Sequence, residues 1–121
     1  MSSVANAPQR LVATVTTNAA GAADVDVGPF RGFLEKIIYT KVDYADTVDF
    51  TITDNQTAED LWNEDNVTAS QIVRPTALDS DLVGGARATV RPIYIDGDVS
   101  IVLANGGDTK SGTFEILCIG A

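Results

Sequence analysis

The stretch "RGFLEKIIYTKVDYADTVDFTITD", residues 31–54, decides the expected fold. In its first part, 33–42, β-branched and aromatic residues dominate, and apolar side chains fall on both faces of an extended chain. Phe33, Ile37 and Tyr39 are predicted to share one face. This pattern is typical of a strand that is covered on both sides or lies at a subunit contact.

The second part of the stretch alternates cleanly between apolar and polar side chains. Val48, Phe50 and Ile52 are predicted to point inward, and the residues between them outward. The segment "DYAD" at 43–46 predicts a turn between the two parts. We therefore expect the two parts to pair as an antiparallel hairpin.

Short alternating segments, each a candidate strand, recur on both sides of this stretch. They are 10–17, 70–75, 87–95, 99–105 and 113–121. Polar or glycine-rich loops are expected at 18–24, 76–86 and 106–112. The Asp-Gly step in "DGD" predicts a tight type I′ turn that joins the two neighbouring strands as a hairpin.

Turn signals at this spacing predict an all-β domain of about seven to eight strands. We expect an antiparallel β-sandwich, a β-tulip or a jelly-roll-like barrel that occupies 10–121 as a single domain. Residues 1–9 are small and polar and are expected to form a flexible N-terminal arm. One short helix is predicted at "TAEDLWNED", 57–65, with Thr57 as its N-cap.

The net charge of the chain limits the kinds of partner that it is expected to bind. The chain has 121 residues, a formal net charge of −9 and no histidine. Nucleic-acid binding needs a cationic footprint, which scattered lysines and arginines do not provide, and anionic membranes are disfavoured for the same reason. A basic partner surface or a divalent cation is compatible with the charge, and so is simple solubility. Residues 1–10 lack the regions of a signal peptide, which leads us to expect folding in a cytoplasm.

The chain lacks the residues that several kinds of catalytic site require. Without histidine, neither a Ser-His-Asp triad nor a Cys-His pair is possible within one chain. Cys118 is the single cysteine and is expected to be a buried small hydrophobe. Lys110 and Ser111 follow glycines but lack the spacing of a phosphate-binding loop. We therefore expect no enzyme activity, no cofactor and no metal.

Paired aspartates leave one alternative open. They occur as Asp24 with Asp26, Asp79 with Asp81, and Asp96 with Asp98. Such loops can supply oxygen ligands to calcium, or carboxylates to a carbohydrate site, although turn chemistry explains them equally well. A calcium- or carbohydrate-binding β-sandwich module is therefore an alternative of another functional class.

Three arginines are the nearest approach to a cationic cluster. Arg74, Arg87 and Arg91 all lie beside predicted strands. They are either ordinary solvated side chains or anchors for an acidic neighbour across a subunit interface, where arginine is favoured.

The order of these segments resembles a known family. "GFLEKIIYTKV", "DFTIT", a polar segment with "LW", "IVRP", "RPIYIDGDVSIVLANGG" and "SGTFEILCIG" follow one another over residues 28–121. This succession is similar to the small all-β virion proteins of tailed bacteriophages, most like capsid decoration (cement) proteins. Neck, tail and baseplate components can share the pattern.

The resemblance implies a structural protein that binds the outer surface of the phage head and stabilises it. It implies the major capsid protein as partner, a homotrimer on the capsid, and assembly in the bacterial host cytoplasm. Ser2, Val4 and Pro8 would belong to an arm that anchors the chain to the capsid. Phe33 and Tyr39 on the two-faced strand would then join the arginines as candidate interface residues.

Overall fold

The protein is all-β and antiparallel over the part of the chain that the structure, a computed structural model, describes, which is residues 8–120. These residues form nine strands and no helix, and hence none that could cross a membrane. The strands are β1 Gln9–Thr16, β2 Ala23–Lys41, β3 Asp49–Asp54, β4 Asp60–Glu64, β5 Gln71–Val73, β6 Thr76–Ser80, β7 Ala86–Pro92, β8 Tyr94–Ala104 and β9 Ser111–Ile119.

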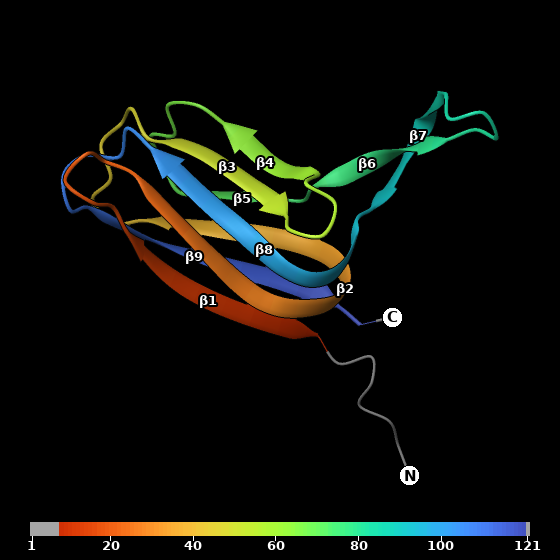
Figure 1. Cartoon of the computed structure of the whole chain (residues 1–121), viewed down its shortest axis with the longest axis horizontal. Coiled ribbons are helices and arrows are strands. Elements are labelled where there is room, and N and C mark those ends of the chain that lie inside the picture. The colour runs from red at the N-terminus through yellow and green to blue at the C-terminus, as the bar shows by residue number, and fades with distance from the viewer. Residues whose placement is uncertain (1–7, 121) are drawn as a thin grey trace, which may run out of the picture.

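The long strand β2 organises the main sheet, in which the strand order is β1-β9-β2-β8-β3-β4. Its first half, from Ala23 to Phe33, pairs with β8, and its second half, to Lys41, pairs with β9. The short strand β5 joins the second half of β2. The sheet curves at β2, so that β1 and β9 lie below and β3, β4 and β8 above (Figure 1).

Glycine allows close backbone approach where β2 curves. Gly32 has a φ of +149°, and a Cβ added to it would lie 2.3 Å from the carbonyl oxygen of Ile119. Only glycine fits this contact, because any side chain would push β9 away from β2.

The core lies between the two halves of the main sheet. Its centre is a group of aromatic rings in which Tyr39, Phe50 and Phe114 meet pairwise with centroids 4.8 to 5.2 Å apart. Trp62 joins the group edge-on, 5.1 Å from Phe50. Edge-to-face and offset contacts of this kind stabilise a core beyond the area that they bury.

The predicted inward residues of β3 are confirmed, and so is the predicted burial of Cys118 on β9. Phe50 and Ile52 are fully buried, as are Phe114, Ile116 and Cys118 on β9. The residues between them are only partly buried. A period of two was enough to assign the inner face of β3, because this strand is regular and packs on the core with one side.

The predicted helix at 57–65 is wrong, because this segment contains strand β4. Ala58 has a φ of +59°, which a right-handed helix cannot accommodate. The Thr57 hydroxyl accepts a local hydrogen bond from the N–H of Glu59, at 3.3 Å, and caps no helix. Trp62 pairs with Ile52 across the sheet and is buried, so tertiary packing outweighs the local cap signal.

The predicted hairpin of 33–42 with 48–53 is also wrong. β2 pairs with β5, β8 and β9, whereas β3 pairs with β4 and β8. Between the two strands, Tyr44 and Val48 are buried, so the connection itself contributes to the core. This buried connection leads from β2 to β3, so the two strands follow each other in the sequence without pairing as a hairpin.

A bulge changes the faces of β2. The register of β2 against β9 shifts between Leu34 and Lys36, which leaves Glu35 as the extra residue. Because of this shift, Leu34 is buried together with Ile37 and Tyr39, and Phe33 faces outward. The prediction that Phe33 shares the inner face is therefore wrong.

The tight turn predicted at "DGD" is absent, because β8 runs continuously from Tyr94 to Ala104 and pairs with β2 on both sides of Gly97. The segment predicted as a loop at 76–86 contains strand β6 instead, in which Leu78 pairs with Val90 on β7 to form a hairpin. This extra pair of strands, β6 and β7, forms a sheet of its own.

Candidate functional site: a projecting hairpin and an exposed aromatic row

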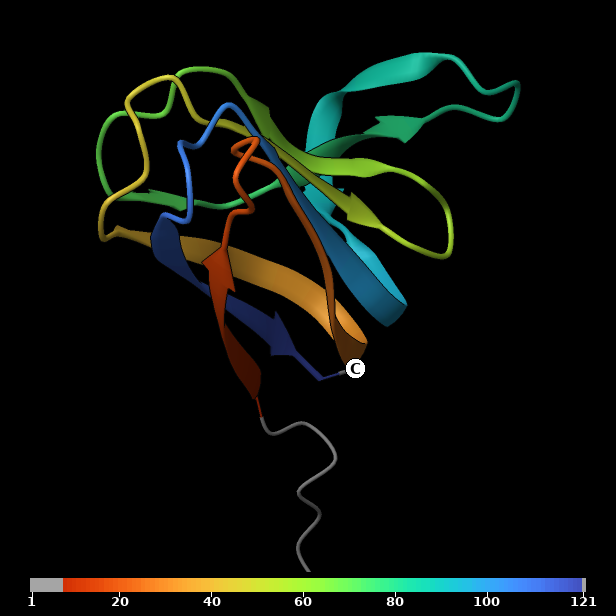
Figure 2. The same cartoon turned by 60° about the vertical axis from the view of Figure 1, so that its left-hand side comes forward.

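The most prominent feature of the surface is a hairpin that stands away from the body, as Figures 1 and 2 show. The projecting hairpin comprises residues 74–92, that is, β6, β7, their turn and the two residues before β6. Its root is fixed, because Ile93 is buried in the core and its carbonyl accepts a hydrogen bond from the N–H of Leu34, at 2.8 Å.

Local hydrogen bonds define the turn of the hairpin. The Asp81 carboxylate accepts hydrogen bonds from the N–H groups of Val83, at 2.9 Å, and Gly85, at 2.7 Å. Gly84 has a φ of +84°, which glycine adopts without strain. Aspartate and glycine are therefore placed as a tight turn requires.

The tip of the hairpin is apolar and uncovered. Leu82 is 100% exposed and Val83 is 92% exposed. On the strands behind them, the cross-strand pair Leu78 and Val90 is also exposed. Large apolar side chains gathered on one projection mark a surface for binding another molecule.

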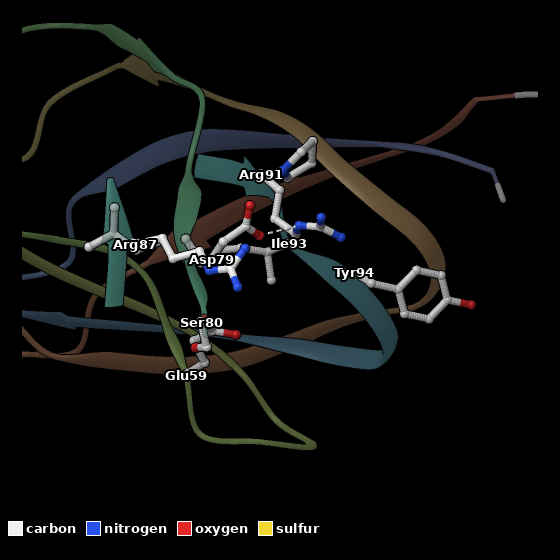
Figure 3. A pocket seen from close by; sticks show the side chains of 10 residues that line it. Glu59, Asp79, Ser80, Arg87, Arg91, Ile93 and Tyr94 are labelled. Carbon is white, nitrogen blue, oxygen red and sulfur yellow. Dashed lines mark hydrogen bonds and ion pairs between the residues drawn. The ribbon is translucent and has the colours of Figure 1, made fainter. Parts of the chain in front are cut away.

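The opposite face of the hairpin is polar. Asp79 accepts hydrogen bonds from the hydroxyl of Thr89, at 3.0 Å, and from the guanidinium of Arg91, with which it forms an ion pair. The contact joins β6 to β7, as the dashed line in Figure 3 shows. The contact holds the two strands of the hairpin together but buries none of its exposed apolar side chains.

An open, mostly polar pocket of about 490 Å³ lies between the hairpin and the body. Figure 3 shows the Tyr94 ring at its edge, pointing away from the hairpin. The lining comes from β6, β7, the start of β8 and the loop before β4: Glu59, Ala77, Leu78, Asp79, Ser80, Arg87, Arg91, Pro92, Ile93 and Tyr94.

The structure brings together two of the three arginines that the sequence singled out. Arg87 and Arg91 both line the pocket, whereas Arg74 is exposed before β6 and does not. Among residues 8–120, Arg87 forms no ion pair with a carboxylate, so its charge is free to meet an acidic partner.

A row of exposed apolar side chains crosses three strands beside the root of the hairpin. Phe33 on β2 lies in register with Tyr94 on β8 and with Ile119 on β9. The Phe33 and Tyr94 rings meet edge-on with centroids 5.3 Å apart. All three side chains are about two fifths exposed. Phe33, which was expected to be an interface residue, is therefore exposed to solvent.

Tyr39 is not available to a partner, which corrects its assignment as an interface residue. Its side chain is 1% exposed, because the bulge at Glu35 turns it into the core. Its hydroxyl is the one buried side-chain polar atom of the described residues without a hydrogen-bond partner. Burial raises the pKa of Tyr39 to about 12.

Four of the six paired aspartates bind protein groups through their side chains. Asp79 and Asp81 are engaged within the hairpin, the Asp96 carboxylate lies 3.7 Å from the guanidinium of Arg31, and Asp26 accepts a hydrogen bond from Ser100 at 2.8 Å. No group of three metal-ligating side chains gathers within residues 8–120. Turn chemistry and ion pairing account for these contacts.

The N-terminal arm falls largely outside the described residues. Ser2 and Val4 lie there, and Pro8 is exposed at the first described position. Gln9 already belongs to β1, where it pairs with Cys118. The Gln9 side chain also donates to the carbonyl of Pro29, at 2.6 Å, and accepts from the N–H of Arg31, at 3.2 Å.

The sequence did not single out the tip residues Leu82 and Val83, nor Tyr94. The signal for the tip was present, since two large apolar residues sit beside Gly84 and Gly85 in a segment otherwise typical of a loop. No protein-family model and no curated protein sequence matches this chain.

Proposed function

We propose that this chain is a structural protein of a tailed-bacteriophage particle, most like a capsid decoration protein that binds the outer surface of the head and stabilises it. The observation that carries the proposal is the projecting hairpin with its uncovered tip of Leu82 and Val83. A rigid body that presents an apolar projection is suited to bind protein. The resemblance of the sequence over residues 28–121 supplies the phage context.

The arrangement of the sheet is compatible with the proposed β-sandwich or β-tulip architecture. Two halves of one sheet face each other, with the aromatic core between them. Hydrogen bonds of the sheet already fix the backbone of such a body. Little conformational entropy is therefore lost when its surface binds a partner.

The proposed partners are the major capsid protein and further copies of this chain, as a homotrimer on the capsid surface. Several weak contacts would act together, because binding of one contact makes the next intramolecular. The row of Phe33, Tyr94 and Ile119 offers such contacts at the root of the hairpin. The free charge of Arg87 offers another in the pocket between the hairpin and the body. Assembly would take place in the bacterial host cytoplasm, and no enzymatic step is part of the proposal.

A neck, tail or baseplate component is the alternative within the same class, since it would use the same surfaces in fewer copies. The calcium- or carbohydrate-binding module is the weaker alternative. Of the paired aspartates that could supply ligands, Asp79 and Asp81 already bind Arg91 and the turn of the hairpin.

The test is to count this chain against the major capsid protein in density-purified particles of the phage that encodes it, by quantitative mass spectrometry. A copy number comparable with that of the capsid protein supports decoration of the head. A handful of copies per particle points to the neck or tail. Absence from the particles overturns the structural role.

The contribution of the N-terminal arm is tested separately. Because Gln9 belongs to β1, the truncation should end at residue 7, which leaves all the pairs of β1 with β9 in place. We expect the truncated chain to melt like the full chain and to attach more weakly to heads that lack it. Equal attachment of the two forms would remove the arm from the proposal.

A further inference from the structure

The apolar side chains of the projecting hairpin are not buried by the rest of the described chain. The cross-strand pair Leu78 and Val90 and the tip residues Leu82 and Val83 are all more than half exposed. A two-stranded hairpin by itself is only marginally stable in water. Burial of these side chains against another surface would both stabilise the hairpin and remove the largest apolar groups that it exposes to solvent.

The charge of the hairpin is opposite to that of the rest of the chain. Residues 74–92 hold three arginines and two aspartates, a net charge of +1. The other residues hold five basic and fifteen acidic side chains, a net charge of −10. A second copy of this chain therefore presents a surface that attracts the hairpin, and complementary charge of this kind guides association.

An apolar groove lies on the outer face of β2 and β5. Ile38 pairs with Ile72 across these two strands, and Ile72 is 54% exposed. The groove has a volume of about 480 Å³, and most of its surface is apolar. Its lining residues are Ile38, Thr40, Ser70, Gln71 and Ile72, together with Tyr39, whose side chain itself points into the core.

Two carboxylates near this groove are already bound within the chain. Glu115 on β9 lies in register with Ile38 and forms an ion pair with Arg10, at 3.1 Å. Both carboxylate oxygens of Glu64 accept hydrogen bonds, one of them from Gln71 at 2.9 Å. The attraction for the hairpin therefore comes from the net negative charge of the rest of the chain.

We propose that the projecting hairpin of one copy docks in the Ile38–Ile72 groove of a second copy. Leu82 and Val83 enter the groove, and the hairpin, with its net charge of +1, faces the negatively charged body of the second copy. The two surfaces lie on different parts of one chain, so the interface is heterologous and repeats around a closed ring or along an open chain of copies.

The first test compares the self-association of the full chain with that of Leu82→Asp/Val83→Asp by sedimentation velocity, from about 1 to about 100 μM. We expect the wild type to form oligomers and the double variant to dissociate at least about 100-fold more readily, because two buried apolar side chains are lost. The matched control is Ala19→Asp/Ala20→Asp, which adds the same charge at an exposed turn. It should associate like the wild type.

Both tip positions are exposed, so the double variant should keep the melting temperature of the isolated chain. A wild type that stays monomeric throughout this range overturns the proposal. A double variant that associates as well as the wild type, or a control that dissociates equally, also overturns it.

The second test identifies the groove. Leu82→Cys and Ile72→Cys chains, both carrying Cys118→Ala and one carrying a size tag, are mixed and treated with a short bismaleimide. We expect cross-linked pairs of one tagged and one untagged chain. In the control, Ala20→Cys replaces Ile72→Cys and should give none. Equal cross-linking in mixture and control, or none in either, overturns the groove as the docking site.

These tests need the purified chain alone. If these tests contradict self-association, the proposed role in a phage particle is not affected. If the chain is absent from phage particles, the proposed docking of the hairpin in the groove is not affected.

Discussion

Tyr39 and Tyr44 lie side by side in the core with nearly parallel rings, 6.1 Å between centroids, yet only one of their hydroxyls has a partner. The Tyr44 hydroxyl donates to the carbonyl of Val15. The Tyr39 hydroxyl is buried without a partner. Two similar side chains in one cluster therefore contribute to stability with opposite signs at their polar ends.

This difference predicts opposite effects of the same substitution. Tyr39→Phe should raise the free energy of unfolding by about 1 kcal/mol, because it removes an unsatisfied buried hydroxyl. Tyr44→Phe should lower it by about 1 kcal/mol, because a hydrogen bond is lost. Urea unfolding of both variants measures the difference. A Tyr39→Phe protein less stable than the wild type would show that its hydroxyl has a partner.

The fold should lose stability in alkali. Burial raises the pKa of Cys118 from 9.0 to about 11 and that of Tyr39 from 10.0 to about 12, and it also raises the pKa of Tyr44, with a smaller effect from Tyr39. The folded chain therefore holds protons that the unfolded chain releases. The stabilisation is complete below about pH 9 and is lost progressively as the pH rises through the folded pKa values.

We expect the free energy of unfolding to fall between about pH 9 and pH 11, by at most about 1.4 kcal/mol per pH unit for each titrating group. Urea titrations at a series of pH values measure the slope. The variant Tyr39→Phe/Cys118→Ala should show a shallower slope. An unchanged slope in that variant would assign the alkaline loss to other groups.

Phe50 is the ring on which the core depends most directly, because it contacts four other aromatic side chains. Phe50→Ala should destabilise the protein by about 3 to 5 kcal/mol through the cavity that it leaves. The control is Val102→Ala on the neighbouring strand, where Val102 is partly exposed on the outer face and should cost less than about 1 kcal/mol. A loss below about 1 kcal/mol for Phe50→Ala would contradict the inward direction of its ring.

Substituting alanine at Gly32 and at Gly84 distinguishes the cost of a steric clash from the cost of backbone strain. Both have positive φ, but a Cβ at Gly32 would lie 2.3 Å from the Ile119 carbonyl oxygen, whereas nothing lies within 4 Å at Gly84. Gly84→Ala should cost about 1 kcal/mol of backbone strain. Gly32→Ala should cost at least about 2 kcal/mol more, because β9 must move. Thermal unfolding compares the two, and equal melting temperatures would disprove the close contact.

The sequence by itself determined the all-β class, the inner face of β3 and the burial of Cys118. Alternation with a period of two is a local property, so the side on which Phe50 and Ile52 lie follows from the strand alone, without knowledge of its neighbours. The sequence also singled out Phe33, which lies beside the root of the hairpin, and Arg87 and Arg91, which line the pocket between the hairpin and the body.

Only the tertiary structure decided which strands pair, because pairing depends on contacts between residues far apart in sequence. The aromatic core draws Trp62 into strand β4 against a local helix signal, and one extra residue at Glu35 reverses the face of Tyr39. The projecting hairpin arises in the same way. Burial of Ile93 fixes its root, whereas the local signal, two apolar residues beside two glycines, does not show that Leu82 and Val83 project away from the core.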